Sequence, residues 1–298
     1  MKIDARTVRK SSEAAVPLSA GQTANDRKAI LVVSFGTTYP EARQAAIDQV
    51  TAKIRLAFPE YTVRQAFTSR RVIERINTRE GIRYLTEEQA LAALAEEGFR
   101  EVVVQPLHME AGYEYDKVRR VVEAYRDKQA FENLYLGRPL LYYAGQEGVP
   151  DDYLAAIQAM RRTFPPIGQQ EAIGLLGHGG LHPSNAVYAA LQLKLQDAGI
   201  AQVYVFTVEG YPGVAELIRR LSADGIRKIT LIPLLLVAGE HARQDMAGDG
   251  PDSFQSRLQD AGFEVSVCLQ GVGENPAIQD LYVQHVKDAI AEKKIFPE

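Results

Sequence analysis

The sequence is poor in two residue types that often constrain a fold: it contains one cysteine, Cys268, and no tryptophan. A single thiol excludes a disulfide within the chain, and it excludes the zinc clusters that are built from several cysteines. Five histidines are present. A metal ion held by this chain would therefore need histidine and carboxylate ligands.

An excess of positive charge and any long apolar run are also missing. The chain has 34 Lys and Arg residues against 38 Asp and Glu residues, a formal net charge of -4, so nucleic acid is not an expected partner. No apolar run approaches the roughly 20 residues that span a bilayer, and the chain start lacks the hydrophobic block of a secretion signal. We expect a cytoplasmic protein without membrane contact, preceded by a loose, polar extension at residues 1–27.

From Lys28 onward, short β-branched runs alternate with longer amphipathic stretches. This alternation is typical of strand-helix-strand units around a parallel sheet, so the predicted fold class is α/β. A chain of 298 residues is long enough for two lobes of this kind. The predicted strands are Ala29–Ser34, Thr62–Phe67, Glu101–Gln105, Ile173–Leu176, Gln202–Thr207, Lys228–Ile232 and Glu264–Cys268.

The second half of the chain repeats the first. The run Gly98–Leu107 aligns without a gap with Gly225–Leu234, and continuing the same register pairs Glu114 with His241. A repeat of this length predicts two similar lobes, each a parallel sheet flanked by helices.

The number of residues between matched positions of the two halves becomes smaller along the chain. The first lobe is therefore predicted to contain extra residues, around Asn77–Glu88. A boundary near Leu140–Pro150 then gives an N-terminal lobe at residues 28–145 and a C-terminal lobe at residues 146–298. Ligands of open parallel sheets sit outside the carboxyl ends of the strands, so two facing lobes would enclose a cleft lined by those ends.

Three residues of the second half fall at or beyond predicted strand ends: His178, Glu209 and His241. Although they are far apart in sequence, the topology would bring them to one edge of the sheet. Two neutral imidazoles and one carboxylate suit a borderline divalent ion such as cobalt, iron, nickel or zinc. The carboxylate could also accept the protons that a ligand ring loses when the metal enters it.

Each of the three also has a plainer interpretation. His178 lies between Gly177 and Gly179, and flanking glycines indicate a sharp bend or a close approach of backbone to a ligand, which favours function. Glu209 could instead only favour the start of a following helix. His241 could be an ordinary exposed histidine of a polar loop, although its position in the repeat favours the site.

The other histidines are weaker candidates. His182 follows His178 by four residues, but Pro183 indicates that the next helix begins only afterwards, so His182 is predicted to line the cleft. His108 lies in the first-lobe loop that corresponds to the loop of His241. The sequence is equally compatible with a His108 that lines the cleft and with one that has a structural role. His285 falls within a predicted terminal helix, where surface exposure or packing is the simpler interpretation.

The first half contributes the turn Ser34-Phe35-Gly36-Thr37 and the aromatic Tyr113. Small and hydroxyl residues at a strand-to-helix turn expose backbone N–H groups, which attract acidic groups of a ligand. The sequence has neither the lysine pattern of a phosphate loop nor the spaced glycines of a dinucleotide fingerprint, so no nucleotide cofactor is expected.

Taken together, several blocks in order resemble the sirohydrochlorin cobaltochelatase (CbiK) family of class II chelatases, from Lys28 to the end of the chain. The blocks are Ser34–Thr38, Gln105–Glu110, Gly177–Gly179 with His182 and Asn185, Val208–Pro212, Ala238–Asp249 and Gly271–Ile278.

The resemblance implies a two-lobed chelatase that inserts cobalt into a tetrapyrrole without using a nucleotide. The same ligand types also suit iron or nickel as the inserted metal. It implies that His178, Glu209 and His241 form the metal site, and that homo-oligomers can form. The macrocycle is then expected against the first-lobe turn and Tyr113, together with Gly179, Gly180 and His182. Gly180 stands where a hydroxyl residue is expected, so a hydrogen bond from that position is in doubt.

Three alternatives remain open at this point. The same ligands accept iron, which would make the product sirohaem. A tetrapyrrole or metal carrier without turnover belongs to a different class, and a proton acceptor beside open metal coordination is more than storage requires. A two-lobed binding protein of the periplasmic type is disfavoured by the missing export signal.

Overall fold

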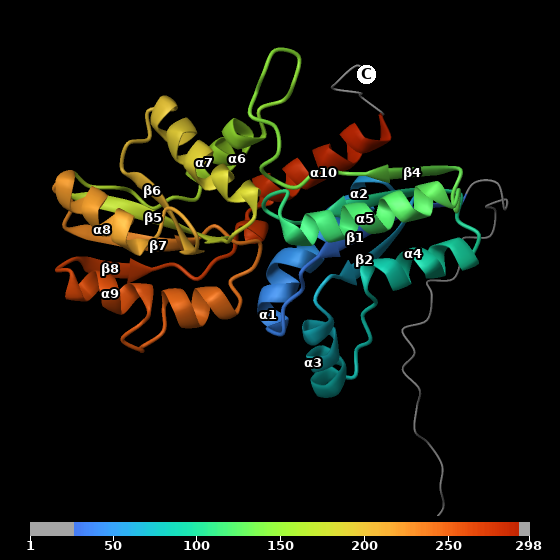
Figure 1. Cartoon of the computed structure of the whole chain (residues 1–298), viewed down its shortest axis with the longest axis horizontal. Helices are drawn as coiled ribbons and strands as arrows, with labels where there is room; N and C mark the ends of the chain where they lie inside the picture. The colour runs from blue at the N-terminus through green and yellow to red at the C-terminus, as the bar shows by residue number, and fades with distance from the viewer. Residues whose placement is uncertain (1–26, 292–298) are drawn as a thin grey trace, which may run out of the picture.

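The computed structural model describes residues 27–291, which form two α/β lobes side by side (Figure 1). Each lobe has a four-stranded parallel sheet between helices, and the strand orders β2-β1-β3-β4 and β6-β5-β7-β8 are equivalent. This confirms the predicted fold class and the internal repeat. The predicted N-terminal extension lies outside the described residues apart from Arg27, and it stays a prediction.

The two central strands of the first sheet, β1 and β3, are apolar runs that are buried on both faces, as parallel strands require. Its strands are β1 (Lys28–Ser34), β2 (Thr62–Phe67), β3 (Glu101–Pro106) and β4 (Asn133–Leu136). Its helical segments are α1 (Pro40–Ala42), the π-helical η2 (Arg43–Asp48), α2 (Gln49–Ala57), α3 (Arg70–Glu80), α4 (Glu87–Glu96) and α5 (Tyr113–Asp127).

The second sheet repeats this plan. Its strands are β5 (Glu171–Gly179), β6 (Val203–Glu209), β7 (Lys228–Pro233) and β8 (Glu264–Val267). The helical segments of this half are α6 (Asp152–Arg161), η3 (Pro183–Asn185), α7 (Ala186–Asp197), α8 (Val214–Ala223), the π-helical η4 (His241–Met246), α9 (Phe254–Asp260), η5 (Val272–Glu274) and α10 (Pro276–Ile290).

The sequence prediction missed β4. This strand has only four residues, Asn-Leu-Tyr-Leu, and only Leu134 among them is buried. So short and partly exposed a run carries no clear period, and it is a strand because it pairs with the edge of β3.

The first lobe contains one helix more than its repeat. Between β2 and β3 the chain forms α3 and α4, whereas only α8 lies between β6 and β7. The added helix begins at the N-cap Ser69 and ends at Gly81, which adopts the left-handed conformation common after a helix. The insertion therefore lies slightly earlier than the predicted segment Asn77–Glu88.

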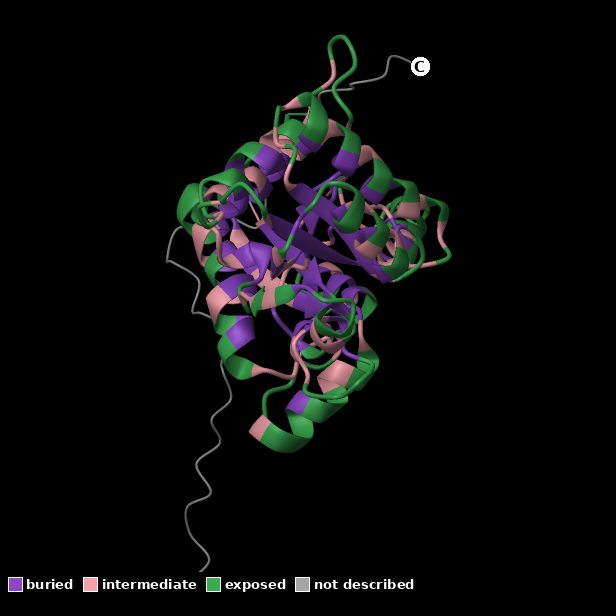
Figure 2. Cartoon of the chain, turned by 90° about the vertical axis from the view of Figure 1, so that its left-hand side faces the viewer, coloured by how far each residue is buried: buried purple, intermediate pink, exposed green. Residues whose placement is uncertain are grey.

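The two lobes share one hydrophobic core. A single cluster of buried side chains runs from Ile30 and Val103 of the first sheet to Ile173 of the second. It includes Tyr282 and Val286 of α10, although α10 follows the second sheet in sequence. Figure 2 shows the buried residues concentrated in the strands and on the inward faces of the helices.

A buried ionic network holds α10 at the boundary between the two lobes, which is here called the seam. Arg138 follows β4 in the chain. Its guanidinium donates to both carboxylate oxygens of Asp152 at 2.9–3.2 Å and pairs with Asp288 of α10 at 2.8 Å. His285, also on α10, lies 3.4 Å from Asp152. The predicted division at residues 145 and 146 stays a prediction, while α10 itself packs on α2, β3 and α6.

Across residues 27–291, the structure contains no helix that is both long and apolar enough to cross a membrane.

Removing the Asp152 carboxylate is expected to destabilise the fold by about 3–5 kcal/mol, because the buried Arg138 loses one of its two carboxylate partners. Burial alone would raise the pKa of Asp152, but hydrogen bonds from His285 and Arg138 outweigh burial and hold that pKa below its ordinary 3.8. The stabilisation is therefore present above about pH 3.8 and is lost as the pH falls through the folded-state pKa.

Urea unfolding of Asp152→Ala at pH 7 and at pH 3 measures this effect, with the exposed Asp260→Ala as the control. Loss of stability should be large at pH 7 and smaller at pH 3. Equal stability of the two variants at pH 7 would show that the network does not hold α10.

Candidate functional site

The first two predicted site residues stand on strands rather than beyond them. β5 continues through His178 to Gly179, β6 continues to Glu209, and the strands still pair at Gly179 and Glu209. Gly179 has φ of 73°, and a Cβ there would lie 1.7 Å from the Glu209 carbonyl oxygen. Only glycine permits so close an approach of two backbones. The glycines around His178 therefore suggested a turn in the sequence, although they belong to a strand.

His241 belongs to the π-helical turn η4 and not to a loop as predicted. Its ring lies against the ring of His178, with centroids 4.6 Å apart and planes at 89°. The structure thus brings together two histidines that are separated by two strands in sequence. Single π-helical turns frequently occur at functional sites, because they re-aim one side chain within a helical segment.

Hydrogen bonds fix which nitrogen each ring offers. His178 Nδ1 lies 2.9 Å from the Gly179 carbonyl oxygen, and His241 Nδ1 lies 2.6 Å from Asp245 Oδ2. Both partners can only accept, so each neutral imidazole carries its proton on Nδ1 and keeps its lone pair on Nε2. A carboxylate that orients a histidine in this way is a recurring support for metal-binding imidazoles.

Glu209 is the third predicted ligand, and its side chain is exposed at the end of β6. Within residues 27–291, no three His, Cys, Asp or Glu side chains lie close enough together to hold a metal ion. The histidine pair is therefore present without a third ligand, and the role of Glu209 stays a prediction.

Glu110 was not among the predicted site residues, yet its carboxylate faces the histidines. The Tyr188 hydroxyl donates to Glu110 at 3.3 Å and accepts from the Gly179 N–H, also at 3.3 Å. Burial raises the pKa of Glu110, while the Tyr188 hydrogen bond and the nearby His178 and His182 act in the opposite direction. Its position just beyond β3, at the edge where the ligands gather, was the signal that could have identified it.

His182 joins the two lobes on one side of the histidine pair. Its Nε2 lies 3.3 Å from Asp116 Oδ2 of α5, and its Nδ1 lies 2.9 Å from the Ser184 hydroxyl. The ring of Tyr113 meets the His182 ring edge to face, with centroids 4.7 Å apart. Both residues thus lie at the boundary between the lobes, and their contact with a ligand stays a prediction.

A second group of contacts joins the lobes through the turn that carries His241. The Tyr39 hydroxyl donates to Glu240 at 2.8 Å, and Arg243 donates to Glu41 at 3.0 Å. The Arg243 guanidinium also lies 4.8 Å from the centroid of the Tyr39 ring. First-lobe residues therefore contact the beginning and the middle of η4.

The residues of the first-lobe turn differ in exposure. Ser34 and Thr37 are buried, and a Cβ on Gly36 would meet the Phe67 ring at 2.8 Å. The Phe35 side chain is 50% exposed and that of Tyr113 is 64% exposed. Of the predicted turn and aromatic residues, these two rings are therefore the ones open to a large ligand.

Two further exposed side chains escaped the sequence prediction. Leu181, which follows Gly180, is 94% exposed, and Tyr211, just beyond Glu209, is 55% exposed. Isolated exposed apolar residues are common on proteins, but these follow the ends of β5 and β6, beside the predicted site.

The remaining histidines have structural positions. Both ring nitrogens of His108 are buried without a hydrogen-bond partner in the described part of the chain. Burial and the nearby Lys117 lower the pKa of His108 to about 4, so its ring is neutral at pH 7. His285 is buried against Asp152 and the Arg138 carbonyl, which agrees with the packing role expected for it.

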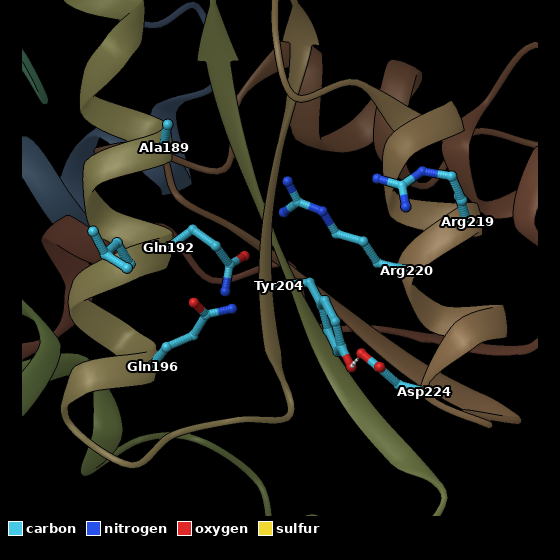
Figure 3. A pocket seen from close by; sticks show the side chains of 8 residues that line it. Ala189, Gln192, Gln196, Tyr204, Arg219, Arg220 and Asp224 are labelled. Atoms are coloured by element: carbon cyan, nitrogen blue, oxygen red, sulfur yellow. Dashed lines mark hydrogen bonds between the residues drawn. The ribbon is translucent and has the colours of Figure 1, made fainter.

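A hollow of about 390 Å³ lies elsewhere, between α7 and α8. Figure 3 shows the Arg220 and Gln192 side chains extending into it, and the Tyr204 hydroxyl donates to Asp224 at 2.6 Å. Tyr204 and Glu209 stand toward opposite ends of β6, roughly 16 Å apart at about 3.3 Å per residue. The hollow is therefore separate from the histidine pair.

Comparison with known proteins agrees with this geometry. Residues 28–291 match the family model described as cobalt chelatase (CbiK). The chain belongs to the CbiK cobalt chelatase family. The predicted family is thereby confirmed for essentially all of the described residues.

Two curated relatives cover nearly the same span. The sirohydrochlorin cobaltochelatase of Salmonella typhimurium is 38% identical over 264 residues, which is 89% of this chain and 97% of that protein. The sirohydrochlorin cobaltochelatase CbiKC of Nitratidesulfovibrio vulgaris is 31% identical over 268 residues, which is 89% of this chain and 91% of that protein.

Among solved structures, SirB from Bacillus subtilis with Fe3+ superposes with a TM-score of 0.60. The match covers 90% of this chain and 97% of that one at 18% identity. At this identity the likeness concerns the fold, and it agrees with the two-lobed α/β architecture.

Because Asp245 holds His241 through Nδ1, Asp245→Ala is expected to weaken cobalt(II) binding by roughly 10- to 100-fold. Titration of the protein with cobalt(II), followed by the visible absorbance of the bound ion, measures the affinity. The exposed Asp249→Ala is the control and should bind as the natural protein does. An unchanged affinity in Asp245→Ala would mean that the carboxylate does not orient the ring.

Replacing Glu110 with Gln is expected to raise the melting temperature at pH 7. A carboxyl whose folded-state pKa exceeds its unfolded-state value contributes stability below the unfolded pKa, near 4.5, and loses it as the pH rises through the folded pKa. Glutamine resembles the protonated form, so it removes the penalty of charge at pH 7 and brings little gain at pH 4. Thermal unfolding at both pH values tests this, with the exposed Glu96→Gln as the control; a lower melting temperature at pH 7 contradicts it.

Proposed function

We propose that this protein inserts cobalt(II) into sirohydrochlorin, or a closely related tetrapyrrole, without using a nucleotide. The observation that carries the proposal is the histidine pair, His178 and His241, with both Nδ1 atoms engaged and both Nε2 lone pairs left for a metal ion. Family membership and the two curated relatives named sirohydrochlorin cobaltochelatase support the same reaction.

In this proposal the metal ion is a substrate and not a resident cofactor. His178 and His241 receive it, and the exposed Glu209 turns toward the pair to complete the ligand set. Neutral imidazoles and a carboxylate bind cobalt(II) firmly enough to strip its water, yet they can release it to macrocycle nitrogens.

The macrocycle is placed against the exposed Phe35 and Tyr113 rings of the first lobe, with Leu181 and Tyr211 on the second. Apolar and aromatic side chains at these positions suit the flat faces of a tetrapyrrole. Gly179, Gly180 and His182 lie along the same boundary. The pyrrole protons that leave as the metal enters need an acceptor, and Glu209 and the buried Glu110 are the carboxylates nearest that path in the proposal.

Other expectations from the sequence stay predictions: a cytoplasmic location, the absence of nucleic-acid and membrane partners, and homo-oligomer formation. Iron is the second candidate metal, because the same ligands accept it. A carrier without turnover is the alternative of a different class.

The test is an anaerobic absorbance assay of sirohydrochlorin with cobalt(II) or iron(II). The natural protein should accelerate cobalt insertion, and His178→Ala and His241→Ala should each lower kcat/KM by roughly 100-fold or more, as expected when a group that acts directly on the metal or its protons is lost. Glu209→Gln should lower kcat by a similar factor if it takes part as ligand or base.

Two controls accompany the assay: Glu60→Gln, an exposed glutamate outside the site, and Arg219→Ala, in the separate hollow. Both should react at the natural rate. Faster insertion of iron than of cobalt would move the assignment to sirohaem formation, and binding of the macrocycle without any acceleration would favour the carrier.

A further inference from the structure

The inserted helix α3 is strongly basic although the chain as a whole carries a net charge of -4. It contains Arg71, Arg75 and Arg79, which are spaced four residues apart and so lie along one side of the helix. All three side chains are exposed. These residues are here called the arginine stripe.

The arginine stripe has no ion-pair partner among residues 27–291. Within the described part of the chain, none of its three guanidinium groups forms an ion pair or a side-chain hydrogen bond, in contrast to Arg64, which pairs with Glu97 of α4. Exposed arginines in natural proteins are commonly offset by nearby carboxylates. On α3 itself, Glu80 is already engaged by Arg43, which leaves Glu74 as the one acidic group without such a partner.

Other residues of α3 fix the helix beside the first-lobe turn. A Cβ on Gly36 would lie 3.1 Å from Val72 Cγ1, so the first turn of α3 touches the loop that carries Phe35. Near the other end of the helix, Arg43 pairs with Glu80 and also donates to the Thr37 carbonyl oxygen at 3.5 Å.

The helix is therefore attached at both ends to the turn that follows β1. Figure 1 shows α3 projecting from the end of β2, next to α1 and on the far side of the molecule from α6. The second lobe has no equivalent of this helix, so the arginine stripe belongs to the first lobe alone.

We propose that α3 captures the acidic rim of the macrocycle through the arginine stripe and steers it into the cleft. This inference rests on the proposed function, and it assigns a binding site for a polycarboxylate ligand. Sirohydrochlorin carries carboxylate side chains around its periphery, and a guanidinium pairs with a carboxylate through two parallel hydrogen bonds. Unpaired charges at the mouth of a cleft raise the encounter rate of an oppositely charged ligand, and salt weakens the effect.

The variant Arg75→Glu/Arg79→Glu reverses two charges of the stripe without touching the residues that anchor α3. At about 10 mM salt, where the Debye length is roughly 30 Å, its KM for sirohydrochlorin should rise by about tenfold. kcat with cobalt(II) should stay unchanged, because the arginines do not touch the reacting atoms. At about 1 M salt, with a Debye length of roughly 3 Å, the KM values of variant and natural protein should converge.

The matched control is Arg161→Glu/Arg162→Glu, an equal change of charge at the exposed end of α6. It should leave KM within about twofold of the natural value. Arg75→Lys/Arg79→Lys keeps the charge but loses the two parallel hydrogen bonds, so it should raise KM less than the charge reversal does. Equal KM values for the natural and reversed proteins at low salt would overturn the proposal, and so would an equal rise in the α6 control.

Binding of metal-free sirohydrochlorin, followed by absorbance, separates this inference from the proposed function. If the natural protein binds the macrocycle and the reversed variant binds it more weakly, the arginine stripe is supported even where no metal is inserted. If both proteins insert cobalt with the same KM, α3 plays no part and the proposed function stands. A natural protein that binds no sirohydrochlorin would overturn both.

Discussion

The arrangement of the two lobes depends on α10, which returns from the second lobe and packs against the first. Tyr282 and Val286 complete a hydrophobic core that both sheets share, and Arg138 joins Asp152 of α6 to Asp288 of α10 inside the seam. A buried guanidinium is tolerated only when its partners are in place, so the network permits one docking of the lobes and disfavours others. The carboxyl ends of the two sheets meet at the histidine pair because this docking is fixed.

Within that frame, neighbouring groups orient the two histidines of the proposed metal site. The Gly179 carbonyl and the Asp245 carboxylate fix the proton of each imidazole on Nδ1. Contacts from the first lobe to Glu240 and Arg243 hold the short turn that bears His241. Ligands held in this way lose little rotamer freedom when a metal ion binds, and their tautomer leaves Nε2 for the ion.

The two lobes repeat one topology but serve different purposes. In the proposed site, the second lobe supplies His178, Glu209 and His241, while the first supplies the exposed Phe35 and Tyr113 rings and the basic helix α3. Where the second lobe has His241, the matched position of the first has Glu114, one of whose carboxylate oxygens is buried without a partner in the described residues. A repeated fold thus becomes asymmetric through its loops, which tolerate change more readily than strands that are buried on both faces.

The α/β class, the repeat and the residues of the histidine pair were determined by the sequence itself, because apolar periodicity and strand-end position are local properties. The family resemblance rested on such local blocks as well. Tertiary structure alone decided that β4 pairs at the sheet edge, that Gly179 lies within a strand, that α10 crosses to the other lobe, and that Glu110 and Asp245 face the site. These features depend on contacts between segments far apart in the chain, and no local pattern encodes which of several distant partners a side chain will meet.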